Sequence, residues 1–107
     1  MKIDVLTFEG CPTGEATLAL VARAVADEGV SAVVNRVEVN DEETARALRF
    51  LGSPSVQVNG RDIEKTRRAD PNYGLTCRIY QTPDGASGMP PAEMVRAALR
   101  SACAGEG

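Results

Sequence analysis

Three cysteines, Cys11, Cys77 and Cys103, carry most of the chemical reactivity in this sequence of 107 residues. The chain contains no histidine, which excludes a Ser-His-Asp triad, a Cys-His pair and any zinc or haem site with histidine ligands. An odd number of widely spaced cysteines is typical neither of a secreted disulfide scaffold nor of a paired CxxC zinc site. We therefore expect free thiols in a reducing, cytoplasmic compartment, with no cofactor and no resident metal.

Cys11 is predicted to lie between a strand and a helix. Residues 3–8 form a short apolar run of β-prone residues, which predicts a strand buried on both faces. Pro12 suits the first turn of a helix, where a missing N–H costs nothing. The free N–H groups of such a turn stabilise a thiolate and lower the pKa of the cysteine. The Thr13 hydroxyl either donates to the same sulfur or faces water.

The elements that follow alternate between helix and strand. Apolar periodicity after Pro12 predicts a helix that ends at Gly29. Residues 32–39 predict a second strand, and Asn40 is expected to cap a second helix that runs to Gly52. Right-handed crossovers would make the first strands parallel.

The second half of the chain predicts a hairpin and a further strand. Ser53-Pro54-Ser55 opens a strand that reaches Asn59-Gly60, and Asn-Gly after an alternating run is a strong hairpin signal. The polar residues 64–74 predict a surface loop. Residues 75–80 predict a strand, which either pairs directly with residues 55–58 or is an additional one.

A final helix completes the predicted architecture. Residues 83–90 are rich in Gly, Pro and Ser and predict a loop, Pro91 begins the helix, and residues 103–107 are expected to fray. The element order β-α-β-α-β-β-α predicts a single α/β domain over residues 1–107, with a mixed four- to five-stranded sheet flanked by three helices.

Four motifs of the sequence are distinctive: Phe8-Glu9-Gly10-Cys11-Pro12, Phe50-Leu51-Gly52-Ser53-Pro54-Ser55-Val56, Asn59-Gly60-Arg61-Asp62-Ile63 and Tyr73-Gly74-Leu75-Thr76-Cys77-Arg78-Ile79-Tyr80. With these motifs the chain resembles small thioredoxin-like proteins over residues 1–102, and the fold of those proteins has this element order. It is similar in particular to bacterial proteins described as DF-family (seleno)proteins or alkylmercury-lyase-like proteins, some of which carry selenocysteine at the position of Cys11. The resemblance implies a thioredoxin-like fold, a nucleophilic redox atom at Cys11 and a cis peptide bond before Pro54.

The resemblance also implies a site, from which this sequence departs at one position. Substrates are expected to contact Pro12 and Thr13 on one side of Cys11, and Ser53-Pro54-Ser55 on the other. The second cysteine of a thioredoxin dithiol is replaced by Gly14. A mixed disulfide on Cys11 must therefore be resolved by Cys77 or by an external thiol.

These observations favour a cytoplasmic thiol oxidoreductase with Cys11 as its sole primary nucleophile. One alternative is an alkylmercury-lyase-like or mercury-handling protein, in which Cys11 and Cys77 bind the metal as substrate. Another is a non-catalytic binding module of the same fold. The expected partner is a thiol or disulfide, either protein or small molecule, and the oligomeric state is left open.

Composition excludes two other kinds of partner. The net charge of −3 and the pI of about 4.9 argue against sequence-independent binding to nucleic acid, which needs a basic face. No apolar run approaches the roughly 18 residues of a membrane span. We therefore expect neither a nucleic acid nor a membrane as partner.

Overall fold

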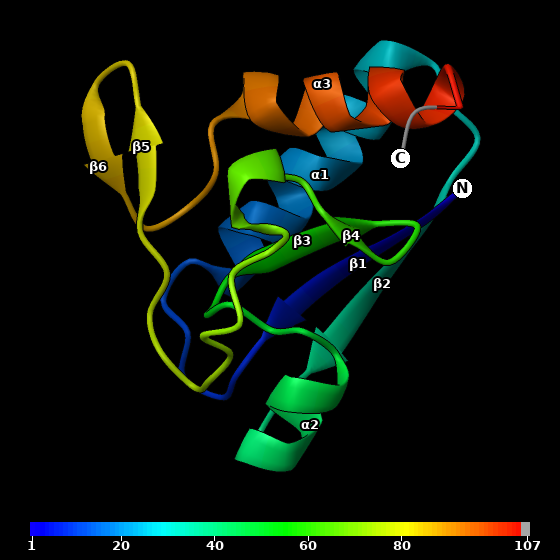
Figure 1. Ribbon diagram of the computed structural model, residues 1–107. Coiled ribbons are helices and arrows are strands. Elements are labelled where there is room, and N and C mark those ends of the chain that lie inside the picture. The colour runs from blue at the N-terminus through cyan, green and yellow to red at the C-terminus, as the bar shows by residue number, and fades with distance from the viewer. Residues whose placement is uncertain (106–107) are drawn as a thin grey trace.

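A four-stranded mixed sheet forms the centre of the protein, for which a computed structural model describes residues 1–105 (Figure 1). The strand order is β2-β1-β3-β4. β1 is parallel to β2 and antiparallel to β3, and β4 pairs antiparallel with β3. The strands are β1 (Lys2–Thr7), β2 (Val33–Glu38), β3 (Ser55–Val58) and β4 (Arg61–Asp62).

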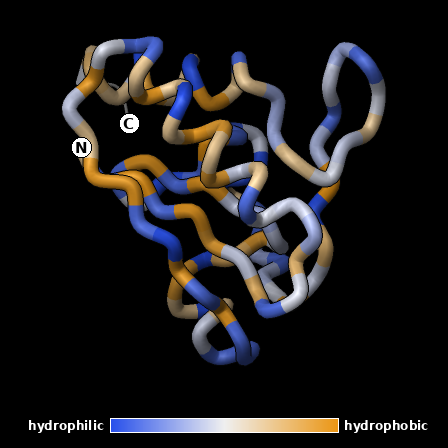
Figure 2. Tube along the Cα trace, turned by 180° about the vertical axis from the view of Figure 1, so that it is seen from behind, coloured by the Kyte–Doolittle hydropathy of each residue, from blue (hydrophilic) through white to orange (hydrophobic). Residues whose placement is uncertain are grey.

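Three helices flank this sheet, as predicted for the thioredoxin-like α/β class. α1 (Gly14–Glu28) and α3 (Ala92–Cys103) pack against each other over one face, and α2 (Glu42–Ala47) lies apart from them, beyond β2 in the chain (Figure 1). Figure 2 shows hydrophobic stretches along the central strands. The larger core lies under α1 and α3 and includes Ile3, Val5, Val21, Val56, Val95 and Leu99, and the smaller one includes Leu6, Val39, Ala45 and Phe50.

The hairpin between β3 and β4 confirms the prediction from Asn59-Gly60. Both residues have positive φ values, 52° for Asn59 and 82° for Gly60. A two-residue turn of this kind matches the twist of the strands that it joins, and Asn-Gly is its preferred sequence. The sheet partly differs from the expected pairing, because β1 and β2 are parallel whereas β3 runs against β1.

The predicted strand over residues 75–80 is wrong in its extent. Residues 75–79 make only one isolated bridge, between Ser53 and Cys77. A longer ladder beside β3 has no place, because β1 and β4 already occupy the two edges of β3. The strand β5 (Tyr80–Thr82) instead pairs with β6 (Gly85–Ser87) in a separate hairpin, and β6 lies within the segment 83–90 that the sequence predicted as a loop.

Helix boundaries also differ from the prediction. α1 begins at Gly14, two residues after Pro12. The cap of α2 is Asp41, whose carboxylate accepts the Thr44 N–H at 2.7 Å, whereas the Asn40 side chain accepts the Glu9 N–H. α2 ends at Ala47 rather than near Gly52, because the chain turns at Arg49 with φ 56°.

The remaining segments complete the description. The polar run 64–74 contains a short 3-10 helix, η1 (Lys65–Arg67). Residues 103–107 were expected to form a frayed tail. Cys103 is instead the last residue of α3, and residues 106 and 107 lie outside the described part. Across residues 1–105, no helix combines the length and the apolar character needed to cross a bilayer.

Candidate active site

Cys11 lies in the loop that joins β1 to α1. The Cys11 N–H donates to the carbonyl of Phe8 at 3.3 Å, which closes a turn directly after the strand. The thiol is free and half-buried, and Pro12 beside it is exposed. The loop therefore presents the sulfur at the end of the sheet where the first turn of α1 begins.

Hydrogen bonds to its sulfur hold the pKa of Cys11 below the ordinary value. Burial raises the pKa, but the hydroxyl groups of Ser53 and Thr13 and the N–H groups of Thr13 and Gly14 together lower it by a larger amount. These donors stabilise the thiolate over the thiol. Since the thiolate is the nucleophilic form, the site favours reactivity at neutral pH.

The Ser53 hydroxyl is well placed for this role. Its oxygen accepts the Phe8 N–H at 3.4 Å. The acceptor role uses a lone pair, so the single hydroxyl proton remains for the sulfur of Cys11. Ser53 is 3% exposed, so solvent competes little for this proton.

Thr13 contacts the same sulfur but directs its proton elsewhere. Its Oγ1 lies 3.8 Å from the Cys11 Sγ. The same hydroxyl donates to the Gly88 carbonyl at 2.8 Å. Both the N–H and the hydroxyl of Thr13 lower the pKa of Cys11. Because a hydroxyl has one proton to give, the hydrogen bond to Gly88 weakens the contribution of the hydroxyl and ties the loop to the segment before α3.

Cys77 lies directly across from Ser53 in the isolated bridge. The Ser53 N–H donates to the Thr76 carbonyl at 2.8 Å, and the Arg78 N–H donates to the Ser53 carbonyl at 2.9 Å. Residues paired in this way project their side chains to the same face. Cys11 and the exposed Cys77 therefore both neighbour Ser53.

A buried ionic network fixes the backbone that carries Cys77. The Arg78 guanidinium donates to both carboxylate oxygens of Asp62, at 2.6 and 2.8 Å, and to Glu64 at 2.9 Å. It also donates to the Ser55 hydroxyl at 3.1 Å and lies over the ring of Tyr80. Arg78 is only 2% exposed. Such a charge is rarely buried unless it is paired.

The Ser53–Pro54 turn is held by the same network. The peptide bond between the two residues is cis. The Tyr80 hydroxyl donates to the Pro54 carbonyl at 2.7 Å, and Tyr80 is fully buried. Burial raises the pKa of Tyr80, which keeps the phenol a neutral donor. The Ser55 hydroxyl donates to the Gly52 carbonyl at 2.5 Å.

The predicted site residues thus have different surroundings. Cys11, Thr13, Ser53 and Cys77 form one neighbourhood, with Pro12 exposed next to it. Pro54 and Ser55 are buried, and the Ser55 hydroxyl supports the turn from inside rather than facing a substrate.

The residues that sequence reasoning missed are those of the network: Asp62, Glu64, Arg78 and Tyr80. The apolar pattern of this run gave no signal for the network, because Ile79 is exposed whereas Arg78 and Tyr80 are buried.

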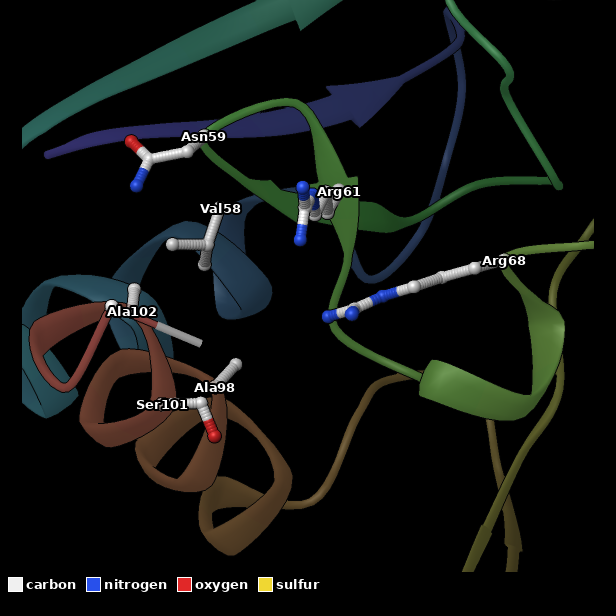
Figure 3. Close-up of a pocket in the computed structure, with 8 residues that line it drawn as sticks. Val58, Asn59, Arg61, Arg68, Ala98, Ser101 and Ala102 are labelled. Atoms are coloured by element: carbon white, nitrogen blue, oxygen red, sulfur yellow. The ribbon is translucent and has the colours of Figure 1, made fainter. Parts of the chain in front are cut away.

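Two hollows lie at opposite ends of the sheet. A shallow one beside the Cys11 loop is lined by Phe8, Glu9, Asn40 and Leu75. The other lies between the β3–β4 hairpin and α3, where the side chains of Arg61 and Arg68 extend into it (Figure 3). The second hollow contains no thiol among its lining residues, which are Val58, Asn59, Arg61, Arg68, Ala98, Ser101, Ala102 and Gly105. The sulfur chemistry therefore belongs to the Cys11 end.

One family model matches the chain. It describes a thioredoxin domain and matches residues 1–63, more than half of the sequence. The matched part contains the Cys11 loop, all four strands of the central sheet and the Ser53–Pro54 turn, and it ends before Cys77. No curated protein and no solved structure shows a significant match.

Proposed function

The chain belongs to the thioredoxin-domain family, and we propose that it is a thiol oxidoreductase in which Cys11 is the primary nucleophile. The observation that supports this most directly is the set of donors around one sulfur. The Ser53 hydroxyl and the N–H groups of Thr13 and Gly14 all stabilise the Cys11 thiolate. A stabilised thiolate on a half-exposed residue is the ordinary requirement for disulfide exchange.

The first step is attack on a disulfide R–S–S–R′. The Cys11 thiolate donates an electron pair to one sulfur, and the S–S bond breaks. R′–S⁻ leaves with the bonding pair and takes a proton from water, while Cys11 becomes joined to R–S in a mixed disulfide. If Cys11 later leaves as a thiolate, the same donors stabilise its sulfur again.

The second step needs another thiol, because Gly14 replaces the second cysteine of a dithiol. If Cys77 attacks the Cys11 sulfur, R–S⁻ leaves and a Cys11–Cys77 disulfide remains, which two equivalents of an external thiol reduce again. If an external thiol attacks the R sulfur instead, it expels the Cys11 thiolate and departs as a new disulfide. A reducing compartment such as the cytoplasm would supply such thiols.

Alkylation of Cys11 as a function of pH tests the proposal. The Cys77→Ser/Cys103→Ser variant leaves Cys11 as the single thiol, so that reaction with iodoacetamide reports on this residue alone. We expect the midpoint of the rate profile to lie below about 8.5, the pKa of an unperturbed cysteine. We also expect a mixed disulfide at Cys11 with a small aromatic disulfide, detected by mass spectrometry.

The control for this test is a variant without the Cys11 thiol. Cys11→Ser in the same background should form no adduct. A midpoint at or above about 8.5, together with no mixed disulfide, would leave the chain as a binding module of this fold.

The placement of both thiols around Ser53 also favours a second candidate, the handling of mercury. Two thiolates suit a soft metal ion, and Cys11 and Cys77 both neighbour one residue. Release of the hydrocarbon from an organomercurial, lost in both Cys11→Ser and Cys77→Ser, would support cleavage. Binding of Hg²⁺ without that release would support storage or transfer only.

A further inference from the structure

The backbone nearest to Cys11 is already paired within the chain. Both main-chain groups of Ser53 are used by residues 75–79, which we call the Cys77 segment: its N–H by the Thr76 carbonyl and its carbonyl by the Arg78 N–H. Ser53 also lowers the pKa of Cys11 through its hydroxyl, and that hydroxyl accepts the N–H of Phe8, three residues before Cys11. The Cys77 segment therefore fills the strand position beside the reactive sulfur.

This pairing matters because extended polypeptides bind by the same groups. A peptide that docks on a sheet edge gains its affinity from main-chain hydrogen bonds to unpaired N–H and C=O groups. At Ser53 no such group is left. A chain paired with the outer edge of the Cys77 segment would lie a further strand spacing, about 4.8 Å, from Ser53.

The Cys77 segment is fixed rather than loosely laid on the site. Arg78 is 2% exposed and forms ion pairs with Asp62 and Glu64. The next residue but one, Tyr80, is fully buried and donates to the Pro54 carbonyl. Moving the segment away would expose these groups or leave buried carboxylates without a partner, which is costly.

Gly52 lets the Cys77 segment approach this closely. A Cβ atom on Gly52 would lie 3.1 Å from the Thr76 carbonyl oxygen and 3.2 Å from the Cβ of Arg78. Only a residue without a side chain fits against the segment at this distance. The contact is thus built into the turn that precedes Ser53.

The space beside the Cys11 loop is bounded on one side by the Cys77 segment. The shallow hollow formed by Phe8, Glu9, Asn40 and Leu75 adjoins the Cys11 loop, and Leu75 of the Cys77 segment is one of its walls. A sulfur with a short substituent fits such a hollow. A chain that continues in both directions from its sulfur meets the segment.

We infer that the Cys77 segment makes the Cys11 site selective for low-molecular-weight disulfides and thiols over extended polypeptides. This inference rests on the proposed function, and it adds the substrate class. The exchange itself is the one written above: one S–S bond breaks, one forms, and the thiolate of the small disulfide leaves.

Two disulfides with the same leaving group test the selectivity. One is bis(2-hydroxyethyl) disulfide, and the other is a flexible peptide of about twelve residues whose central cysteine forms a mixed disulfide with 2-mercaptoethanol, long enough to pair as an extended strand. Both are reacted with the Cys77→Ser/Cys103→Ser variant, and the adduct on Cys11 is identified by mass spectrometry. Attack on the peptide sulfur leaves the peptide on Cys11 and releases 2-mercaptoethanol, whereas attack on the other sulfur releases the peptide thiol. The peptide should react at least about tenfold more slowly, because it must displace two backbone hydrogen bonds. A peptide that reacts as fast as the small disulfide, or faster, overturns the inference.

Two glycine variants test whether the Cys77 segment sets the ratio of the two reaction rates, small disulfide over peptide disulfide. Gly52→Ala pushes a methyl group against Thr76 and Arg78 and should bring the two rates closer together. Gly85→Ala is the matched control, since Gly85 has a similar φ of 109°, against 115° for Gly52, but open space around it. It should leave the ratio unchanged. Equal effects of the two variants would show that backbone strain, not the segment, sets the ratio.

Amide hydrogen exchange in the unsubstituted chain provides a measurement that does not depend on any variant. The N–H groups of Ser53 and Arg78 should exchange slowly, and the N–H of Cys77, which makes no backbone hydrogen bond within residues 1–105, should exchange fast. Fast exchange at all three overturns the inference. Failure of Cys11 to react with either disulfide, with an ordinary alkylation profile, would instead overturn the proposed function.

Discussion

The two cysteines that flank Ser53 are held in opposite ways. At Cys11 the side chain is controlled: a hydroxyl and two N–H groups bond its sulfur, while the loop around it is partly exposed. At Cys77 the backbone is controlled: both neighbouring residues pair with Ser53, while the thiol itself is exposed. The Cys11 loop therefore controls the ionisation of the Cys11 sulfur, and the Cys77 segment controls which molecules can approach that sulfur.

This difference coincides with the extent of the family match. Cys11 and Ser53 lie within the matched residues 1–63, and Cys77, Arg78 and Tyr80 lie beyond them. The link between the two regions is Asp62, which belongs to the matched part and holds Arg78 of the other. The nucleophile thus belongs to the matched part of the chain. The Cys77 segment is attached to that part through the backbone hydrogen bonds to Ser53 and through the buried Arg78.

The largest change in stability should come from removing the buried charge of Arg78, which holds the Cys77 segment. Arg78→Met leaves the carboxylates of Asp62 and Glu64 without their partner, and we expect the free energy of unfolding to fall by about 3–5 kcal/mol. Urea denaturation followed by circular dichroism measures the change. The cause is the uncompensated charge, since methionine preserves most of the buried volume.

Arg61→Met is the control for this change. Arg61 precedes Asp62 in the β3–β4 hairpin but is exposed. Its replacement should therefore alter the free energy of unfolding by less than about 0.5 kcal/mol. If Arg78→Met had an effect as small as that of Arg61→Met, the Cys77 segment would not be anchored as described, and the contrast between the two cysteines would disappear.

Much of the Cys11 region was predictable from the sequence because its determinants are local. A β-prone run, a following Pro12 and the Asn59-Gly60 turn each act over a few residues, and the structure has the strand, the helix and the hairpin in those places. The boundaries that differed, at α1 and α2, differ by a few residues and depend on single turns such as that at Arg49.

The Cys77 segment was less predictable because its determinants are distant in sequence. Its short run of β-prone residues is typical of a strand, and this composition alone predicts one. The partner of Arg78 is Asp62, 16 residues earlier, and β4 occupies the edge of β3 that a longer strand would need. No local pattern contains either fact.

The next largest effect should be on the pKa and the alkylation rate of Cys11. Ser53→Ala removes the hydroxyl donor, so the pKa of Cys11 should rise and the alkylation rate at neutral pH should fall about three- to tenfold. The iodoacetamide profile in the Cys77→Ser/Cys103→Ser background measures both. An unchanged profile would mean that the N–H groups of Thr13 and Gly14 alone stabilise the thiolate.

The same substitution should change the pH dependence of stability. The pKa of Cys11 is lowered in the folded protein, so the folded state binds fewer protons than the unfolded chain between that pKa and about 8.5. Stability therefore rises with pH through this window and is lost as the pH falls through the folded pKa. Ser53→Ala should narrow the window, which thermal unfolding at a series of pH values would detect.

The smallest effect should come from Thr13, although its oxygen also lies near the sulfur. Because the Thr13 hydroxyl donates its proton to the Gly88 carbonyl, Thr13→Val should change the alkylation rate of Cys11 by less than about twofold. Valine keeps the methyl group that lies beside Gly88, and Thr13→Ser keeps the hydroxyl as a control. If Thr13→Val slowed alkylation as much as Ser53→Ala while Thr13→Ser did not, the proton would be shared with the thiolate, and the two hydroxyls would have equal roles. The expected inequality follows from where each hydroxyl directs its one proton: the Thr13 proton goes to the Gly88 carbonyl, whereas the Ser53 oxygen accepts the Phe8 N–H and keeps its proton for another acceptor.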